Sequence, residues 1–242
     1  MKETIVEIFS SLQGEGPYVG YRQIFIRFAG CNLRCSYCDT SESLQYEQSA
    51  RIENRPGSGE FKFVANPLSM TDIAQYVQQL LVERHHSISL TGGEPLCHVA
   101  AINQLAQLLT VPFYLETNGT LVDELAAVLP AIDMISMDIK LPSSAGKDCF
   151  AAHRQFLKLA VAKKLFIKIV LSSESNESEF NEALSIIAAA GPAIPLVLQP
   201  VTARLPGQEL TGERLLSFFA MAARRLENVR VIPQVHKILN VL

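Results

Sequence analysis

Hydrophobic residues recur every three or four positions in long stretches of the chain after residue 70, and each stretch is followed by a short continuous apolar run. The first pattern is typical of helices that bury one face, and the second is typical of strands covered on both faces. The predicted helices span residues 71–84, 99–109, 122–128, 149–162, 177–190 and 212–226. The predicted strands span residues 87–91, 113–116, 134–139, 166–171, 194–198 and 229–232. This part of the chain is therefore predicted to alternate between helix and strand.

Regular alternation of helices and strands indicates parallel strands joined by right-handed crossover connections. Apolar runs at residues 4–9 and 23–29 predict two more strands ahead of this region. The predicted fold class is α/β, with strands that close wholly or partly into a (β/α) barrel. The sequence has 242 residues and is 48% hydrophobic, which predicts a single domain over residues 1–242 with one large core.

The chain contains five cysteines, and three of them, Cys31, Cys35 and Cys38, lie in one short stretch. A structural zinc site uses four protein ligands, as does an iron-sulfur cluster that only transfers electrons. Three thiols would leave one metal position open for chemistry. The alternative is a non-catalytic zinc or iron-sulfur module whose fourth ligand is a distant residue such as His98 or His236.

Composition narrows the class of protein. Cys97 and Cys149 stand alone and are expected to fill small apolar spaces. The first residues lack the basic-then-apolar form of a signal peptide, so the thiols are expected in a reducing cytoplasm. A net charge of -3 argues against a broad nucleic-acid surface. The uncharged stretch that begins at Ala183 is interrupted by Gly191 and Pro195, which argues against a membrane span. A small-molecule substrate is therefore favoured.

Polar residues of unusual type collect where the predicted strands end. Active sites of parallel α/β folds lie at the carboxyl ends of strands, so these residues are expected to share one site. They are Thr91, Gly92, Gly93, Glu94, Asn118, Ser136, Asp138, Lys140 and Gln199. A pair of glycines also suits any tight turn, so only Glu94 in that motif indicates function. Asp138 equally suits a local partner for Lys140.

The cysteine spacing C-x3-C-x2-C and the motif Gly92-Gly93-Glu94-Pro95 resemble those of the radical S-adenosylmethionine superfamily. The resemblance implies a [4Fe-4S] cluster on Cys31, Cys35 and Cys38, with S-adenosylmethionine bound to the remaining iron. The cofactor-binding residues that it implies are Tyr37, Gly92, Gly93, Glu94, Asn118, Ser136, Asp138, Lys140 and Gln199. The resemblance implies that Glu94 and nearby backbone accept the methionine ammonium and that Asn118 reaches the ribose hydroxyls of S-adenosylmethionine. A glycyl-radical activating enzyme, which shares the cysteine spacing but acts on a protein, remains an alternative.

Three further stretches, Leu12-Gln13-Gly14-Glu15-Gly16, Phe25-Ile26-Arg27 and Cys38-Asp39-Thr40, are similar to those of the 7-carboxy-7-deazaguanine synthase family within this superfamily. The resemblance extends to Gln199-Pro200 and Gln234-Val235-His236-Lys237. It implies conversion of 6-carboxy-5,6,7,8-tetrahydropterin to 7-carboxy-7-deazaguanine with loss of ammonia, in queuosine and related 7-deazapurine biosynthesis.

The same resemblance implies substrate contacts, a metal ion and partners. The implied substrate-binding residues are Leu12, Gln13, Gly14, Glu15, Arg27 and Thr91. Glu15 suits two N–H bonds from the guanidine-like edge of the pterin, and Arg27 suits its carboxylate. Thr40 is implied as a Mg2+ ligand through its hydroxyl. The implied partners are a flavodoxin- or ferredoxin-type electron donor and a second copy of the chain in a homodimer.

Residues 41–69 have mixed charge, a turn sequence at Pro56-Gly57-Ser58-Gly59 and no clear period. They are predicted to form an irregular segment with at most one short hairpin. Because the segment follows Thr40 directly, it is expected to fold over the cluster side of the barrel. The helix after it is expected to be capped by Thr71 or Asp72.

Overall fold

The computed structural model describes residues 1–202 and 209–242. The strands are β1 (Lys2–Glu3), β2 (Ile5–Leu12), β3 (Arg22–Phe28), β4 (Ser49–Glu53), β5 (Phe61–Ala65), β6 (Leu68–Ser69), β7 (Ser87–Gly92), β8 (Phe113–Thr117), β9 (Met134–Asp138), β10 (Lys164–Leu171), β11 (Leu196–Pro200) and β12 (Val229–Val231). The α-helices are α1 (Met70–Leu80), α2 (Val99–Leu108), α3 (Val122–Val128), α4 (Pro142–Ala145), α5 (Phe150–Ala160), α6 (Glu177–Ala190), α7 (Gly212–Ala223) and α8 (Val235–Leu239). The short 3-10 helices are η1 (Gly16–Tyr18), η2 (Ser41–Leu44), η3 (Pro95–His98) and η4 (Leu129–Ala131). The predicted alternation after residue 70 is confirmed.

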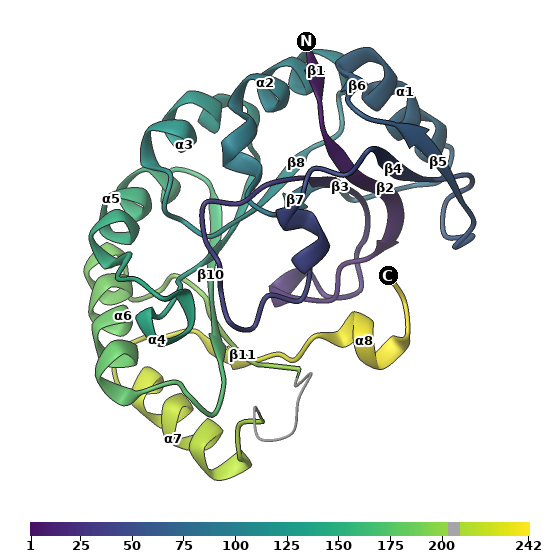
Figure 1. Cartoon of the computed structure of the whole chain (residues 1–242). Helices are drawn as coiled ribbons and strands as arrows, with labels where there is room; N and C mark the ends of the chain where they lie inside the picture. The colour runs from purple at the N-terminus through teal and green to yellow at the C-terminus, as the bar shows by residue number, and fades with distance from the viewer. Residues whose placement is uncertain (203–208) are drawn as a thin grey trace.

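The main sheet has ten strands in the order β12-β11-β10-β9-β8-β7-β3-β2-β4-β5, and β1 pairs separately with β6. The sheet curves into an arc, and helices α1, α2, α3, α5, α6 and α7 follow its convex side (Figure 1). The two end strands do not pair with each other, so the predicted partial barrel is confirmed. The C-terminal segment with α8 lies across the open side of the arc (Figure 1).

The strand directions differ between the two parts of the chain. Neighbours from β7 to β12 are parallel, and β3 is parallel to β7. β2 is antiparallel to β3, and β5 is antiparallel to β4. The prediction of parallel strands is therefore wrong for these N-terminal pairs. The connection between β2 and β3 holds only η1, which is too short for the crossover that parallel strands require.

Residues 41–69 are more regular than predicted. β4 pairs in parallel with β2, so most of the segment extends the edge of the sheet. Ala50 and Ile52 on β4 are fully buried, and their burial explains why this short strand joins the sheet. The expected cover of the cysteine loop is limited to η2, where the Gly30 N–H donates to the Ser43 carbonyl at 2.6 Å. The short hairpin allowed for this segment is present as β4 and β5, and pairing of β4 with β2 makes it part of the main sheet.

Helix α1 begins with a cap that the sequence analysis did not select. The Ser69 hydroxyl accepts the Asp72 N–H at 3.1 Å, and the Asp72 carboxylate accepts the Ser69 N–H at 3.3 Å. This reciprocal arrangement is a capping box, with Ser69 as the N-cap. The prediction of Thr71 or Asp72 as the cap is wrong because both lie inside the first turn.

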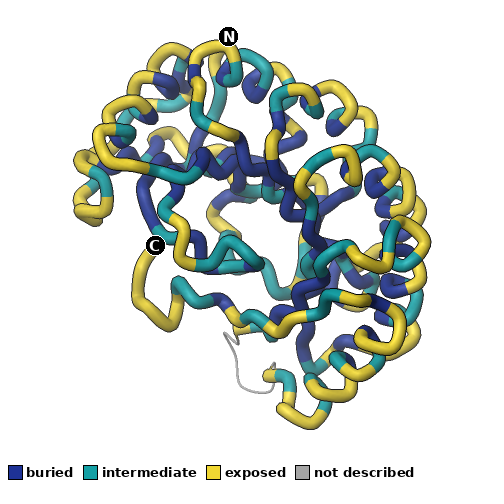
Figure 2. The backbone as a smooth tube through the Cα atoms, turned by 180° about the vertical axis from the view of Figure 1, so that it is seen from behind, coloured by how far each residue is buried: buried dark blue, intermediate teal, exposed yellow. Residues whose placement is uncertain are grey.

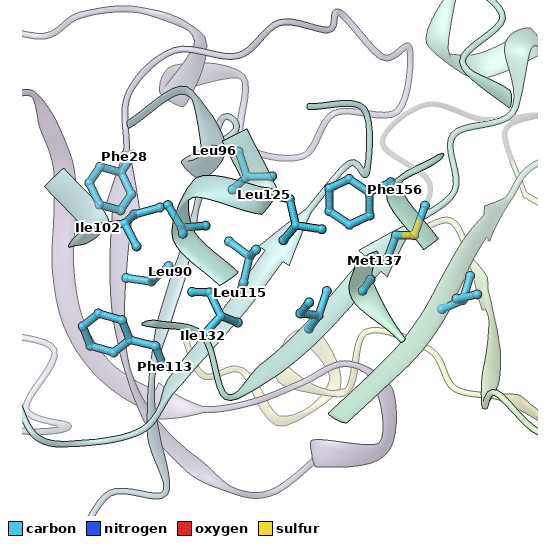
Figure 3. Packing of buried hydrophobic residues seen from close by; sticks show 14 of the residues in the cluster. Phe28, Leu90, Leu96, Ile102, Phe113, Leu115, Leu125, Ile132, Met137 and Phe156 are labelled. Atoms are coloured by element: carbon cyan, nitrogen blue, oxygen red, sulfur yellow. The ribbon is translucent and has the colours of Figure 1, made fainter. Parts of the chain in front are cut away.

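The convex face of the sheet packs on the helices through apolar side chains. Figure 3 shows part of this core, where Leu90 and Leu115 from the strands lie close to Ile102 and Leu125 from the helices. Buried strands line the inside of the arc while exposed residues follow the outer helices (Figure 2). Among the helices of the described residues, none has the length and hydrophobicity needed to span a membrane.

The concave face carries the alternate residues of the same strands, because successive side chains of a strand point to opposite faces. A small apolar cluster closes its base and consists of Tyr114, Met134, Phe166 and Val197. Two residues further along these strands the side chains are polar, namely Glu116, Ser136, Lys168 and Gln199. The fold therefore places a layer of polar groups above an apolar floor.

Candidate active site

A cavity of about 240 Å³ lies on the concave side of the sheet. It is lined by every residue that the sequence analysis selected for the site, namely Leu12, Gln13, Gly14, Glu15, Arg27, Cys31, Cys35, Tyr37, Cys38, Thr40, Thr91, Gly92, Gly93, Glu94, Asn118, Ser136, Asp138, Lys140 and Gln199. It is also lined by residues that were not selected, including Asp39, Glu116, Lys168, Gln234, His236 and Lys237. The residues expected to share one site therefore line a single cavity.

The cysteine loop lies directly against the end of β7. The Cys38 N–H donates to the Cys35 carbonyl at 3.1 Å, which turns the loop between these two thiols. A Cβ on Gly93 would lie 1.9 Å from the carbonyl oxygen of Gly30, so only glycine allows the two segments to approach this closely. Burial raises the pKa of Cys35, and metal binding must therefore drive loss of its proton.

The three thiols fit a [4Fe-4S] cluster better than a single metal ion. Each thiolate of such a cluster binds a different iron atom. Within residues 1–202 and 209–242, no three His, Cys, Asp or Glu side chains are arranged to hold one metal ion. His98 places Nε2 2.7 Å from the Ala29 carbonyl and Nδ1 3.0 Å from the Glu3 carboxylate. Both of its ring nitrogens are used, so His98 does not serve as a fourth zinc ligand.

Beside the cysteine loop, buried polar atoms have no partner in the described part of the chain. They are the Tyr37 hydroxyl and Oδ1 of Asp138. The Lys140 ammonium donates to Asp138 Oδ2 at 2.8 Å, which confirms the predicted local pair, and lies 5.0 Å from the centre of the Tyr37 ring. A buried carboxylate oxygen without a donor is costly. The ammonium and ribose hydroxyls of S-adenosylmethionine are donors of the kind that would satisfy it.

Glu94 connects the ends of β7 and β8. Its carboxylate accepts the Leu96 N–H at 3.1 Å, the Thr117 hydroxyl at 2.8 Å and the Asn118 N–H at 2.8 Å. Burial raises the pKa of Glu94 to about 7. The side chain expected to accept an ammonium is thus largely engaged by the protein.

Asn118 holds the turn after β8 against the cysteine loop. Its amide nitrogen donates to Asn32 Oδ1 at 2.8 Å, and its amide oxygen accepts the Thr120 hydroxyl at 2.6 Å. Its main-chain carbonyl lies 3.0 Å from Nε2 of the buried His153. The side chain that was expected to reach ribose hydroxyls is therefore oriented by protein contacts toward the cysteine loop.

On the opposite side of the cavity, Glu15 is already fully engaged. One of its oxygens lies 2.5 Å from the Lys168 ammonium, and the other accepts the side-chain amides of Gln199 at 3.1 Å and Gln234 at 2.9 Å. Burial opposes ionisation of Glu15, but the charge and hydrogen bond of Lys168 outweigh it and lower its pKa to about 2. This arrangement does not favour Glu15 as the acceptor of two pterin N–H bonds. The same arrangement places Gln199, which was expected to bind the cofactor, beside Glu15.

Glu116 is a second carboxylate in the same cavity, and its surroundings differ. It accepts the Gln13 amide at 2.8 Å, the Ser89 hydroxyl at 3.0 Å and the Thr91 hydroxyl at 2.9 Å. Within the described ranges, no Lys, Arg or His nitrogen lies within 4 Å of it. The sequence analysis missed Glu116 as a site residue, although an acidic residue at the end of an apolar strand was the available signal.

Arg27 lies on β3 with its side chain 15% exposed, so the expected burial of this strand arginine is confirmed. Its Nε donates to Glu7 at 2.8 Å, and the guanidinium lies 6.0 Å from the centre of the Phe9 ring. Thr40 lies at the edge of the cavity, and its carbonyl accepts the Ser43 hydroxyl at 2.6 Å.

The C-terminal segment completes the cavity wall. The Gln234 amide donates to Asp39 at 2.7 Å, and the Val235 N–H donates to the Gly14 carbonyl at 2.9 Å. A Cβ on Gly14 would lie 2.1 Å from Nδ1 of His236, so glycine is needed for this contact. The similarity of residues 234–237 to the resembled family was the only signal in the sequence for this wall.

The fold and the cysteine site define a radical S-adenosylmethionine protein. The family model described as the Radical SAM superfamily matches residues 25–187. QueE from Escherichia coli has a similar structure, with a TM-score of 0.62, 20% identity, and coverage of 98% of this chain and 95% of that one. A radical SAM methyltransferase from Sphaerobacter thermophilus has a TM-score of 0.57 at 13% identity, over 94% of this chain and 77% of that one.

Sequence relatives specify the family further. The 7-carboxy-7-deazaguanine synthase of Geobacter sulfurreducens is 43% identical over 98% of this chain and 96% of the relative. The enzyme of the same name from Thermococcus kodakarensis is 35% identical over the full length of both. The chain belongs to the 7-carboxy-7-deazaguanine synthase family.

Proposed function

We propose that this chain converts 6-carboxy-5,6,7,8-tetrahydropterin to 7-carboxy-7-deazaguanine, with ring contraction and loss of ammonia, as a step in queuosine or related 7-deazapurine biosynthesis. The observation that carries the proposal is one cavity that contains both the three-cysteine loop and a polar wall with Arg27, Thr91 and Glu116. Family membership supports the same reaction, and it disfavours the glycyl-radical activating and zinc-module alternatives.

Cys31, Cys35 and Cys38 would hold the [4Fe-4S] cluster. When bound, the cluster and S-adenosylmethionine supply the electron and the 5'-deoxyadenosyl radical that removes hydrogen from C6 of the pterin. Asp138 offers an oxygen without a partner among the described residues to a donor of the cofactor, and Lys140 is suited to its carboxylate. The apolar cluster forms the floor of the cavity, and the C-terminal segment forms part of its wall.

The donor-rich edge of the pterin is assigned to Thr91 and Glu116 in preference to Glu15. The Thr91 hydroxyl donates its proton to Glu116, so its remaining lone pairs are available to accept N–H bonds. The carboxyl group of Glu116 has no close cation in the described structure, and its oxygens are strong acceptors for N–H donors. Arg27 remains the proposed partner of the substrate carboxylate, oriented by Glu7.

Mg2+ is proposed to bind near Thr40, whose hydroxyl is a hard oxygen ligand at the cavity edge. Mg2+ takes few protein ligands and completes its shell with water and substrate oxygens. Thr40→Val should abolish stimulation of turnover by Mg2+, while Thr40→Ser should retain it. Equal Mg2+ dependence of both variants would remove Thr40 from this role.

The proposed partners are a flavodoxin- or ferredoxin-type electron donor and a second copy of the chain in a homodimer. A cytoplasmic location is proposed because the five cysteines are free of disulfides, which suits a reducing compartment. Analytical ultracentrifugation of the reconstituted protein tests the dimer.

The reaction is tested by anaerobic incubation of the reconstituted protein with S-adenosylmethionine, dithionite and the carboxytetrahydropterin. Mass spectrometry should detect 7-carboxy-7-deazaguanine together with ammonia release. Cleavage of S-adenosylmethionine without this product would contradict the substrate assignment. Absence of both cleavage and an iron-sulfur absorption band would contradict the radical chemistry itself.

A further inference from the structure

A row of contacting charged side chains crosses the cavity above its apolar floor, from one side to the other. On the cofactor side, Asp138 Oδ2 accepts the Lys140 ammonium at 2.8 Å and lies 3.4 Å from the Lys168 ammonium. On the substrate side, the same Lys168 ammonium lies 2.5 Å from Glu15. Lys168 therefore contacts one carboxylate from each side of the cavity.

Both ends of this row of charged side chains are also connected to the cysteine loop. The Lys140 ammonium lies over the ring of Tyr37, which stands between Cys35 and Cys38 in the sequence. Glu15 accepts the amide of Gln234, which also donates to Asp39, the residue after the last cysteine of the loop. The row of charged side chains thus links β9, β10, the segment after β2 and the C-terminal segment into one connected unit.

Lys168 occupies the central position of this unit. Its side chain is 13% exposed, and it projects from the middle of a strand whose alternate residues Ile167 and Ile169 are buried in the opposite core. Without the ammonium, Glu15 would lose its only ion-pair partner among the described residues and Asp138 would keep only Lys140, which is unfavourable for both buried acidic groups. Removing Lys168 should therefore displace both carboxylates and the backbone that carries them.

We infer that Lys168 is a positioning residue that aligns the substrate-binding segment around Glu15 with the cofactor-binding pair Asp138 and Lys140. The consequence for catalysis rests on the proposed function. Hydrogen transfer from the pterin requires the two reactants to be held in register, and small misplacements reduce such rates strongly. Loss of Lys168 should uncouple cofactor cleavage from pterin turnover, so that more 5'-deoxyadenosine forms for each molecule of product.

The first test uses the protein without cluster or substrate, and so does not depend on the proposed reaction. Hydrogen–deuterium exchange is measured on the parent, Lys168→Met and the matched control Lys164→Met, which alters an exposed lysine of the same strand. Lys168→Met should raise exchange in peptides covering residues 12–16 and in those covering 138–142, while Lys164→Met should change neither. A change in only one of the two segments, or in neither, would overturn the inference.

The second test measures coupling in the reconstituted enzyme. The ratio of 5'-deoxyadenosine to 7-carboxy-7-deazaguanine should rise by about tenfold or more in Lys168→Met, and stay within about twofold of the parent in Lys164→Met. An equal fall in both products, with an unchanged ratio, would indicate a structural role only and overturn the inference. If the parent forms no 7-carboxy-7-deazaguanine, the proposed function fails, and the exchange experiment still decides whether Lys168 aligns the two segments.

A double variant separates loss of alignment from general loss of stability in both tests. Glu15→Gln combined with Lys168→Met removes both members of the buried pair, which is better tolerated than removing one. This double variant should melt closer to the parent than Lys168→Met does, yet retain the raised ratio and the raised exchange. Recovery of the parent ratio in the double variant would overturn the positioning role.

Discussion

The two sides of the cavity differ in the partners of their buried polar groups. On the substrate side, Glu15 is neutralised by Lys168 and two amides within the described structure. On the cofactor side, the Tyr37 hydroxyl and one oxygen of Asp138 are buried without a partner among the described residues. Unsatisfied buried groups are rare in folded proteins and are often explained by function. Glu15 is thus held by protein contacts, whereas the oxygen of Asp138 is open to a donor that a ligand would bring. Oε1 of Gln199, beside Glu15, is also buried without a partner among the described residues.

Glu116 is the exception on the substrate side, because its donors are all uncharged. The contrast with Glu15 indicates that two carboxylates in one cavity have separate tasks. Glu15 is held in the wall by its ion pair with Lys168, and Glu116 is the carboxylate that we propose for substrate binding.

Cys35→Ala should have the largest effect, because it removes a cluster ligand on the cofactor side. Cleavage of S-adenosylmethionine under dithionite should fall by about 10³-fold or more, with a lowered iron content. Cys97→Ala, which alters an exposed cysteine, should retain the cleavage activity and the iron content of the parent. Detection of 5'-deoxyadenosine by chromatography checks the result. Retained cleavage in Cys35→Ala would contradict the cluster assignment.

Gly93→Ala should break the contact between β7 and the cysteine loop. The added Cβ would lie 1.9 Å from a backbone oxygen, so the backbone must shift at a cost of about 3 kcal/mol in the free energy of unfolding. Gly212→Ala, where no atom lies within 4 Å of the added Cβ, should change stability by about 0.5 kcal/mol or less. Urea denaturation of the two variants checks the difference, and equal stabilities would contradict the close approach.

The ion pair of Glu15 should make stability depend on pH on the acid side. Its folded pKa of about 2 lies below the ordinary 4.5, so its stabilisation is complete above pH 4.5 and is lost as the pH falls toward 2. The shift corresponds to about 3 kcal/mol. Glu15→Gln should remove this part of the acid dependence in denaturation curves, whereas Glu60→Gln, at an exposed position, should leave it intact. An unchanged profile in Glu15→Gln would contradict the pairing.

Glu116→Gln should raise the KM for the carboxytetrahydropterin by about 10- to 100-fold, because it removes a charge-assisted acceptor. Cleavage of S-adenosylmethionine in the absence of pterin should be unaffected. A pterin analogue without the 2-amino group should bind parent and variant about equally if that group is the partner of Glu116. A loss of the same size with the analogue would assign Glu116 to the protein scaffold.

The regular part of the fold could be predicted because its signals are local. Helices α3 and α6 have the predicted bounds, since amphipathic periodicity decides them within one stretch of sequence. The place of the hairpin β4–β5 in the main sheet could not be predicted, because both strands are short, lie at the sheet edge and depend on pairing of β4 with β2. Ser69 was missed as a cap because the start of α1 is set by hydrogen-bond geometry within a single turn.

The sequence by itself determined the cysteine loop, the glycine motif after β7 and many of the residues that line the cavity, though not Lys168, because spacing and strand ends are properties of the linear chain. Only the tertiary structure decided which of those residues are free to act. Glu15 and Lys168 are 153 positions apart, and their contact depends on the loop after β2 meeting the face of β10. The same folding leaves Glu116 without a close cation among the described residues. Charge pairing is a three-dimensional property, and here it separates a carboxylate that supports the cavity from one placed to bind the substrate.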